Sequence, residues 1–173
     1  MGTQQHRELE RWIAATDGSC LGPHPGRSGW AWAVSKHPAL FIADWNSGGM
    51  GEATSYHAEL RALVELLHFL PPEQPVEIRM DSQSVISAAT KWRHRWRKNG
   101  WKRARQGTIA HLNLIKEMDE LLEGRDVRFK WVRAHLSREE GDPLNFFADR
   151  AARAAARNQI SPADVSIRTA AGV

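Results

Sequence analysis

The sequence predicts an α/β fold built on a mixed β-sheet, and two observations support it. Three segments with strand character, 11–17, 30–35 and 40–45, follow one another through short links, which is typical of an antiparallel meander. Further along, a strand-like segment at 76–81 follows a helical segment at 55–70, so it should lie parallel to the first strand through a right-handed crossover. Both kinds of strand pairing are therefore expected in one sheet.

Length and composition limit the class of protein. The 173 residues suffice for one domain with a buried core, and a hydrophobic fraction of 42% is typical of a globular chain. A single cysteine, Cys20, excludes an intrachain disulfide. No apolar run is long enough to span a membrane, and residues 1–10 lack the apolar part of a signal peptide. We therefore expect a cytoplasmic protein, with a monomer as the default.

The first strand ends in an acid. Alternation along 11–17 places Asp17 on the same face as Ile13 and Ala15. An unpaired carboxylate on an apolar face is costly, so we expect a positive charge beside it. The Gly- and Pro-rich segment 18–29 predicts a turn, and segment 46–54, with three glycines, predicts a loop.

Two further acids are Glu59, in the predicted helix at 55–70, and Asp81, at the end of the strand that follows it. Leucines at helical spacing predict that helix over 55–70. Glu59 lies in about its first turn, where the helix dipole stabilises an acid, and its position alone favours that role over one beside Asp17. Asp81 ends the strand at 76–81, so Asp17 and Asp81 should both lie at carboxyl ends of parallel strands, where open α/β sheets place their ligand sites.

The middle of the chain is strongly basic. Residues 82–116 contain nine Lys or Arg and no acid, whereas the whole chain carries only +4. This asymmetry favours a polyanionic partner over a merely solvated surface. Helices are predicted over about 82–90, with Ser82 as N-cap, and over about 108–123. A strand at 127–132, a polar loop and an Ala-rich helix over about 145–157 complete the pattern.

Six segments, in this order, resemble motifs of the bacterial type 1 ribonuclease H family. They are Thr16–Gly22, Ala58–Leu60, Asp81–Val85, the basic stretch Lys91–Lys102, Trp131–His135 and Ala148–Ala156. The resemblance implies the RNase H fold, a five-stranded mixed sheet of order 3-2-1-4-5 with helices on both faces and a basic helical protrusion. We expect an RNase H domain over 8–158 and a flexible C-terminal tail over 159–173.

The resemblance also implies an activity. Members of the family are endonucleases that hydrolyse the RNA strand of RNA–DNA hybrids and leave 5′-phosphate and 3′-hydroxyl ends. Two Mg²⁺ ions, or Mn²⁺ in their place, would be held by Asp17, Glu59, Asp81 and Asp149, which reverses the dipole interpretation of Glu59. Carboxylates suit Mg²⁺ because it prefers hard oxygen ligands. His135 would assist proton transfer or phosphate release, although without the resemblance it is most simply a solvated histidine.

We expect ten residues of this chain to contact the hybrid. They are Ser19, Cys20, His24, Thr54, Gln83, Trp96, Arg97, Lys98, Trp101 and Lys102. The turn after Asp17, together with Gln83, would read the 2′-hydroxyl groups that distinguish RNA from DNA. Cys20 is equally a small buried residue, and Thr54 equally a helix N-cap. For Trp92 a small satellite core is the simpler expectation.

The chain departs from the family pattern in two places. The stretch from His135 to Asp149 is longer than usual and carries Glu139, Glu140 and Asp142, while the glycine-rich turn has an extra Pro23 and has His24 where Asn is usual. Two alternatives stay open: a catalytically weak hybrid-binding module, or another nuclease of the RNase H-like fold such as an integrase-like strand-transfer protein.

Overall fold

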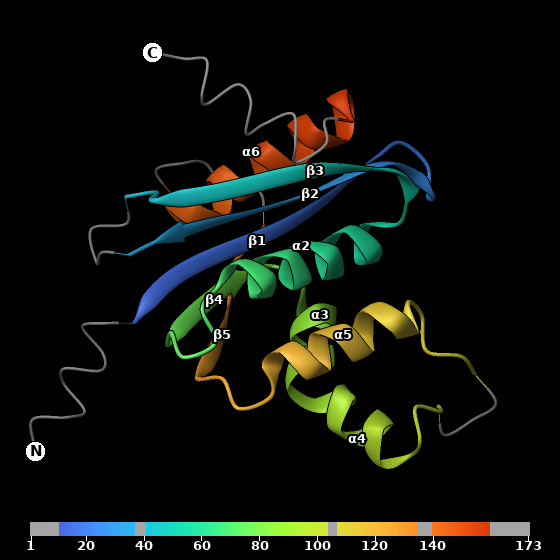
Figure 1. Cartoon of the computed structure of the whole chain (residues 1–173). Coiled ribbons are helices and arrows are strands. Elements are labelled where there is room, and N and C mark those ends of the chain that lie inside the picture. The colour runs from blue at the N-terminus through green and yellow to red at the C-terminus, as the bar shows by residue number, and fades with distance from the viewer. Residues whose placement is uncertain (1–10, 37–40, 104–106, 135–139, 160–173) are drawn as a thin grey trace, which may run out of the picture.

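A five-stranded sheet with strand order β3-β2-β1-β4-β5 forms the centre of the protein, and helices cover both of its faces (Figure 1). The computed structural model describes residues 11–36, 41–103, 107–134 and 140–159. The elements are β1 (Trp12–Leu21), β2 (Gly26–Ser35), β3 (Asp44–Ala53), α2 (Ser55–Phe69), β4 (Val76–Met80), α3 (Gln83–Ser87), the π-helical segment η1 (Ala88–Trp92), α4 (Arg93–Lys98), α5 (Leu112–Leu122), β5 (Val127–Trp131) and α6 (Pro143–Asn158). The predicted fold class and strand order are confirmed.

Strand β1 pairs with β2 in antiparallel and with β4 in parallel orientation. Its pairing with β2 continues from Ile13 to Leu21, opposite Ser35 to Arg27. The predicted turn over 18–29 is therefore wrong at both ends, since only 22–25 lies between the strands. The site acid Asp17 stands inside this ladder, opposite Ala31.

The prediction of a strand at 40–45 and a loop at 46–54 is wrong, because β3 occupies the second segment. The glycines that suggest a loop make room for neighbouring groups instead. A Cβ atom at Gly48 would lie 2.8 Å from the ring of Trp30, which is buried under the strand. At Gly49 it would lie 2.6 Å from the backbone of Gln159, at the end of α6. Glycine in a strand often marks such close approach.

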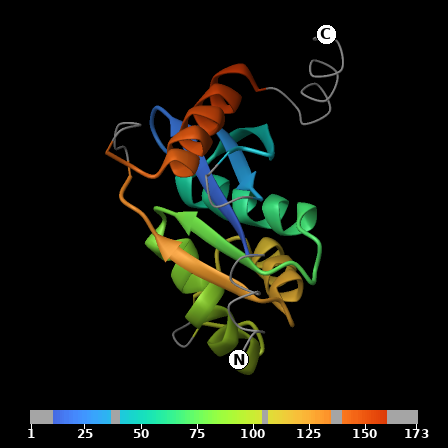
Figure 2. The same cartoon turned by 90° about the vertical axis from the view of Figure 1, so that its left-hand side faces the viewer.

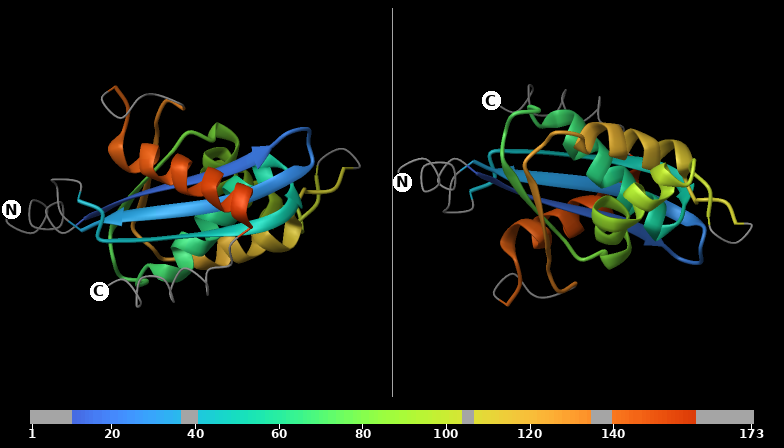
Figure 3. Two further views of the ribbon diagram at one scale, coloured as in Figure 1. Left: turned by 90° about the horizontal axis from the view of Figure 1, so that it is seen from above. Right: turned by 90° about the horizontal axis from the view of Figure 1, so that it is seen from below.

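The two faces of the sheet carry unequal cores. Helix α6 lies across β1, β2 and β3 on one face, while α2 and α5 cover the other (Figures 2 and 3). The α2 side holds the large core, with the fully buried side chains Leu60, Leu63, Leu67, Ile78, Met80 and Ile115 among its members. The α6 side is a small cluster of Ala15, Ala33, Leu144 and Ala148. Small side chains let α6 approach the sheet closely.

Helix α4 and its neighbours form the protrusion that lies away from the sheet in Figure 1. The expectation for Trp92 and Trp96 is wrong, because Trp96 is 8% exposed and belongs to the large core, whereas Trp92 is 37% exposed. Their rings lie 5.7 Å apart, centroid to centroid. The helix predicted from 108 begins only at Leu112, after His111, which has a left-handed backbone conformation (φ 55°).

Within the described ranges, no helix combines the length and the apolar character needed to cross a membrane.

Candidate active site

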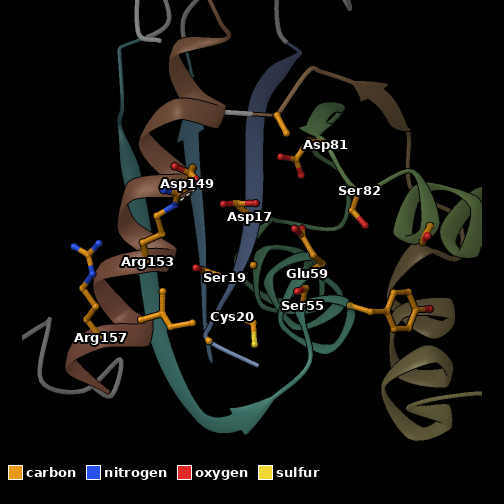
Figure 4. A pocket seen from close by; sticks show the side chains of 16 residues that line it. Asp17, Ser19, Cys20, Ser55, Glu59, Asp81, Ser82, Asp149, Arg153 and Arg157 are labelled. Atoms are coloured by element: carbon orange, nitrogen blue, oxygen red, sulfur yellow. Dashed lines mark hydrogen bonds and ion pairs between the residues drawn. The ribbon is translucent and has the colours of Figure 1, made fainter. Parts of the chain in front are cut away.

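Three carboxyl groups from distant parts of the chain converge beside the middle of β1. Carboxylate oxygens of Asp17, Glu59 and Asp81 all lie within 4.8 Å of one another. Asp17 comes from β1, Glu59 from α2, and Asp81 follows β4 (Figure 4). Asp149 approaches from α6, on the opposite face of the sheet, and its carboxyl group is within hydrogen-bonding reach of Asp17. The four acids that the resemblance selects are therefore neighbours in space.

Gly18 brings Glu59 to this site. A Cβ atom at Gly18 would collide with the backbone of Ala58 and Glu59, so α2 packs directly on β1 at this point. The backbone of Gly18 also hydrogen-bonds the carboxyl group of Glu59. The helix begins nearby, where the Thr54 hydroxyl accepts a hydrogen bond from the amide of His57 at 3.2 Å. The predicted N-cap role of Thr54 is confirmed.

Two contacts fix α6, and with it Asp149. A Cβ atom at Gly29 would lie 2.7 Å from the carbonyl oxygen of Ala152, so this helix also packs directly on the sheet. At the N-terminus of α6, the Asp142 carboxylate accepts a hydrogen bond from the amide of Asn145 at 2.9 Å. The same carboxylate forms an ion pair with Arg79 of β4 at 2.5 Å. Asp142, an extra acid in the lengthened stretch, is thus the N-cap that ties α6 to β4.

Burial and mutual repulsion raise the pKa of two of the acids well above the ordinary range. For Asp17 the main cause is burial, followed by the negative charges of Asp81 and Asp149. For Glu59 it is burial, followed by the charges of Asp17 and Asp81. A positive charge was expected beside Asp17. The groups that shift its pKa are all carboxyls, so none of them provides that charge.

A divalent cation fits this set of ligands. The donors are hard carboxylate oxygens, the kind that Mg²⁺ prefers. The Oε2 atom of Glu59 is buried, and within the described part of the chain it has no hydrogen-bond partner. A buried carboxylate oxygen without a partner is costly, and a metal ion would remove that cost. Asp17, Glu59, Asp81 and Asp149 are the residues that could hold it.

The acids line a cavity of about 670 Å³. Two predicted substrate residues, Ser19 and Cys20, also line it. Ser55, Tyr56, Arg153 and Arg157 are among the lining residues that were not selected from the sequence. The arginines had a usable signal, because Asp149, Arg153 and Arg157 are spaced by four on one helix and so share a face. Arg153 Nε donates to Asp149 Oδ1 at 3.0 Å.

The other predicted residues that the structure describes are not among those lining this cavity. His24 is exposed in the turn between β1 and β2, and Gln83 is exposed at the start of α3. His135 falls outside the described residues. Lys98 and Lys102 are exposed on the protrusion, and Trp101 is half-buried against the large core, with Lys116 Nζ 5.6 Å from its ring centre.

The cations of the protrusion are partly neutralised, contrary to the sequence-based expectation. Asp119 of α5 is buried and binds Arg93 at 2.7 Å and Arg97 at 2.5 Å. Glu123 adds a contact to Arg97 at 3.0 Å. Burial alone would raise the pKa of Asp119, but the hydrogen bonds and charges of Arg97 and Arg93 lower it below its usual value. The basic stretch lacks acids in sequence, yet α5 supplies them in space.

Comparisons with known proteins agree with this geometry. The RNase H family model matches residues 10–157. Ribonuclease HI of Streptomyces coelicolor is 47% identical over 150 residues, which cover 85% of this chain and 62% of that protein, so the chain matches under two thirds of that relative. Ribonuclease H of Tropheryma whipplei (strain Twist) is 43% identical over 147 residues, or 84% of each chain.

Among solved structures, LC9-RNase H1, described as a type 1 RNase H with the type 2 active-site motif, is similar with a TM-score of 0.72 and 25% identity, covering 88% of this chain and 74% of that one. The family match spans most of the chain and includes all four converging acids. The chain belongs to the RNase H family.

Proposed function

We propose that the protein is an endoribonuclease that hydrolyses the RNA strand of RNA–DNA hybrids and leaves 5′-phosphate and 3′-hydroxyl ends. The observation that carries this proposal is the convergence of Asp17, Glu59 and Asp81 within 4.8 Å, with Asp149 beside them, in a chain of this family. Carboxylates crowded in this way repel each other, and bound cations relieve the repulsion.

The four acids would act as ligands for two divalent cations, Mg²⁺ or Mn²⁺. Bound there, two such ions would activate the attacking water and stabilise the leaving oxygen. The chain's part is to hold the ligands in place: Gly18 sets the position of Glu59 against β1, and Asp142 with Arg79 sets the start of the helix that carries Asp149. Burial of Asp17 and Glu59 makes their unpaired charges costly, which favours a bound cation.

We propose that His135 assists proton transfer or release of the cleaved phosphate. In that role it improves the reaction without holding the ligands together. His135→Ala should therefore keep part of the activity, whereas Asp17→Asn should keep almost none. Equal losses in the two variants would contradict the assisting role.

Substrate contacts follow from where the exposed groups lie. Ser19 and Cys20 border the acids and would meet the RNA strand in the minor groove, with Gln83 and His24 further out. Thr54, besides capping α2, would hold a phosphate of the DNA strand.

On the protrusion, Lys98 and Lys102 would meet backbone phosphates beside Trp101. Because Trp96 is buried, the exposed ring of Trp92 replaces it as the second aromatic contact, and Arg97 would reach a phosphate only by sharing or leaving Asp119. We further propose a cytoplasmic monomer.

A labelled-substrate assay tests the main proposal. The protein is incubated with Mg²⁺ and an RNA–DNA hybrid, a matched DNA duplex or a matched RNA duplex, with Asp17→Asn as the inactive control. Cleavage confined to the RNA of the hybrid is the expected result. Hybrid binding without cleavage would indicate a binding module, and cleavage or joining of the DNA duplex would indicate a strand-transfer enzyme.

A further inference from the structure

A row of arginines extends the cavity away from the acids. Asp149, Arg153 and Arg157 follow one another along one face of α6, as Figure 4 shows, and both arginines line the same cavity as Asp17 and Glu59. Successive members of the row are four residues apart, which corresponds to a rise of about 6 Å along the helix. The cavity therefore has an acidic end and a basic wall.

Arg27 of β2 adds a third guanidinium group at the far end of this wall. Its Nη2 atom donates a hydrogen bond to the carbonyl oxygen of Arg157, in the last turn of α6. In the sheet, Arg27 is paired with Leu21, which itself lines the cavity. We call Arg27, Arg153 and Arg157 the arginine row.

The outer part of the row lacks counter-charges. Within the described ranges, neither Arg27 nor Arg157 forms an ion pair with an acid, whereas Arg93 and Arg97 of the protrusion share Asp119. Two arginines four residues apart on a helix also repel each other slightly. The arrangement therefore adds little to stability, and it leaves at least the Arg157 guanidinium available to an anion beside the cavity.

We propose that the arginine row binds phosphates of the RNA strand next to the phosphate that is cut. This inference rests on the proposed function. Four carboxylates would repel a polyanionic strand, and a basic wall beside them offsets that repulsion. The planar guanidinium group donates two parallel hydrogen bonds to a phosphate. The arginine row starts with Arg153, next to the proposed metal ligand Asp149. The phosphates nearest to the row should therefore belong to the strand being cleaved.

Arg157→Gln is the clean test, because Arg153 also holds Asp149 and a change there would disturb a proposed metal ligand. Arg150→Gln is the matched control, since Arg150 is exposed on the same helix and lies 5.8 Å from the ring centre of Phe146, away from the cavity lining. We expect Arg157→Gln to raise KM for the hybrid about five- to tenfold, with kcat within about twofold, and to reduce the salt slope of binding by about one. Arg150→Gln should match the wild type.

Single uncharged methylphosphonate linkages, built with a 2′-deoxynucleotide, then locate the contact. Binding is measured with the inactive Asp17→Asn protein, with and without Arg157→Gln. With one particular RNA-strand phosphate near the cut made neutral, Arg157→Gln should no longer weaken binding of the hybrid. The proposal is overturned if the effect of Arg157→Gln on affinity vanishes only with neutral DNA-strand linkages. It is also overturned if Arg157→Gln behaves like Arg150→Gln.

The two proposals fail in different ways. If the wild type does not cleave the hybrid, the proposed function is wrong, and the binding measurements still decide whether the arginine row contacts the RNA strand. If the wild type cleaves while Arg157→Gln leaves KM and the salt slope unchanged, only the arginine row is wrong.

Discussion

The acidic cavity and the basic protrusion are both clusters of like charge, but they differ in what surrounds them. In the cavity, Asp17 and Glu59 are buried, and the charges that act on them are those of other carboxyls. In the protrusion, Arg93 and Arg97 share the buried carboxylate of Asp119. In the first cluster the groups that shift the pKa of Asp17 and Glu59 include no cation, while Arg153 pairs with Asp149 beside them. The second cluster is partly compensated by Asp119.

This difference separates function from structure. A compensated ion-pair network holds α4 against α5, and its loss should cost stability. Crowded, buried carboxylates lower the stability of the folded protein by repelling each other. A cation that binds between them relieves this repulsion, and the free energy released adds to its binding. The following experiments set the two clusters against each other, in order of expected effect.

The largest effect should come from Asp17→Asn. The substitution removes one of the crowded charges and a proposed metal ligand. We expect the rate of hybrid cleavage to fall by roughly a thousandfold or more, because charge stabilisation in the transition state depends on this group. Without metal, however, the variant should unfold at a higher temperature than the wild type because repulsion is reduced. Calorimetry in the presence of a chelator measures the second effect.

Asp44→Asn is the control for that stabilisation. Asp44 is paired with Lys36 at 2.7 Å, at a half-exposed position away from the cavity. Its substitution should not raise the unfolding temperature. A wild type that is more stable than Asp17→Asn without metal would show that the acids do not repel each other as described.

Asp119→Asn should have the opposite character. It leaves two arginines without their shared carboxylate, so we expect a loss of about 2–3 kcal/mol in the free energy of unfolding, near the lower end for broken buried pairs. The rate of hybrid cleavage at saturating substrate should change little. Urea unfolding together with steady-state kinetics makes the comparison, and a large loss of kcat without loss of stability would place Asp119 in the active site instead.

The two clusters should also respond to pH with opposite signs. The pKa values of Asp17 and Glu59 are raised in the folded protein, so above the unfolded values of about 4 the folded state binds more protons, and stability falls as pH rises towards the raised values. The pKa of Asp119 is lowered, so its contribution is present above about pH 4 and is lost as pH falls through the lowered value.

Unfolding free energies measured without metal across this range test both signs. The wild type should lose stability from mildly acidic to neutral pH more steeply than Asp17→Asn. The deficit of Asp119→Asn should shrink below about pH 4. Parallel curves for the wild type and Asp17→Asn would remove the basis for raised pKa values in the cavity.

The smallest effect should come from the uncompensated cations of the protrusion. Lys98→Ala with Lys102→Ala removes two exposed charges, so KM should rise about threefold to tenfold and the salt slope should fall, while kcat stays nearly unchanged. Adding Arg97→Ala should cost stability as well, because Arg97 is bound to Asp119. A change confined to kcat would contradict a role in substrate binding.

Local patterns predicted the order of elements and the positions of Asp17 and Asp81, whereas Glu59 and Asp149 were selected as site residues by the family resemblance. Strand alternation around Asp17, leucine spacing before Pro71 and the Ser82 cap are properties of neighbouring residues. Local patterns failed at β3, where Gly48 and Gly49 have the signature of a loop but provide space for Trp30 and Gln159 from other elements.

The ion pairs that compensate these charges could not be predicted from the sequence either. Asp119 lies 22 residues or more from its partner arginines, and Asp142 lies 63 residues from Arg79. Such pairs depend on how helices pack, which a single sequence does not reveal. For the same reason, sequence spacing cannot decide which of Trp92 and Trp96 is buried, since both share one face of a helix one turn apart.

If the crowded acids form a cation site, Mg²⁺ should affect the stability of the wild type and of Asp17→Asn differently. The unfolding free energy of the wild type and of Asp17→Asn is determined at neutral pH with a chelator and with millimolar Mg²⁺. We expect Mg²⁺ to stabilise the wild type, to stabilise Asp17→Asn much less, and so to abolish or reverse the higher stability of the variant. Equal responses of the two proteins to Mg²⁺ would contradict it.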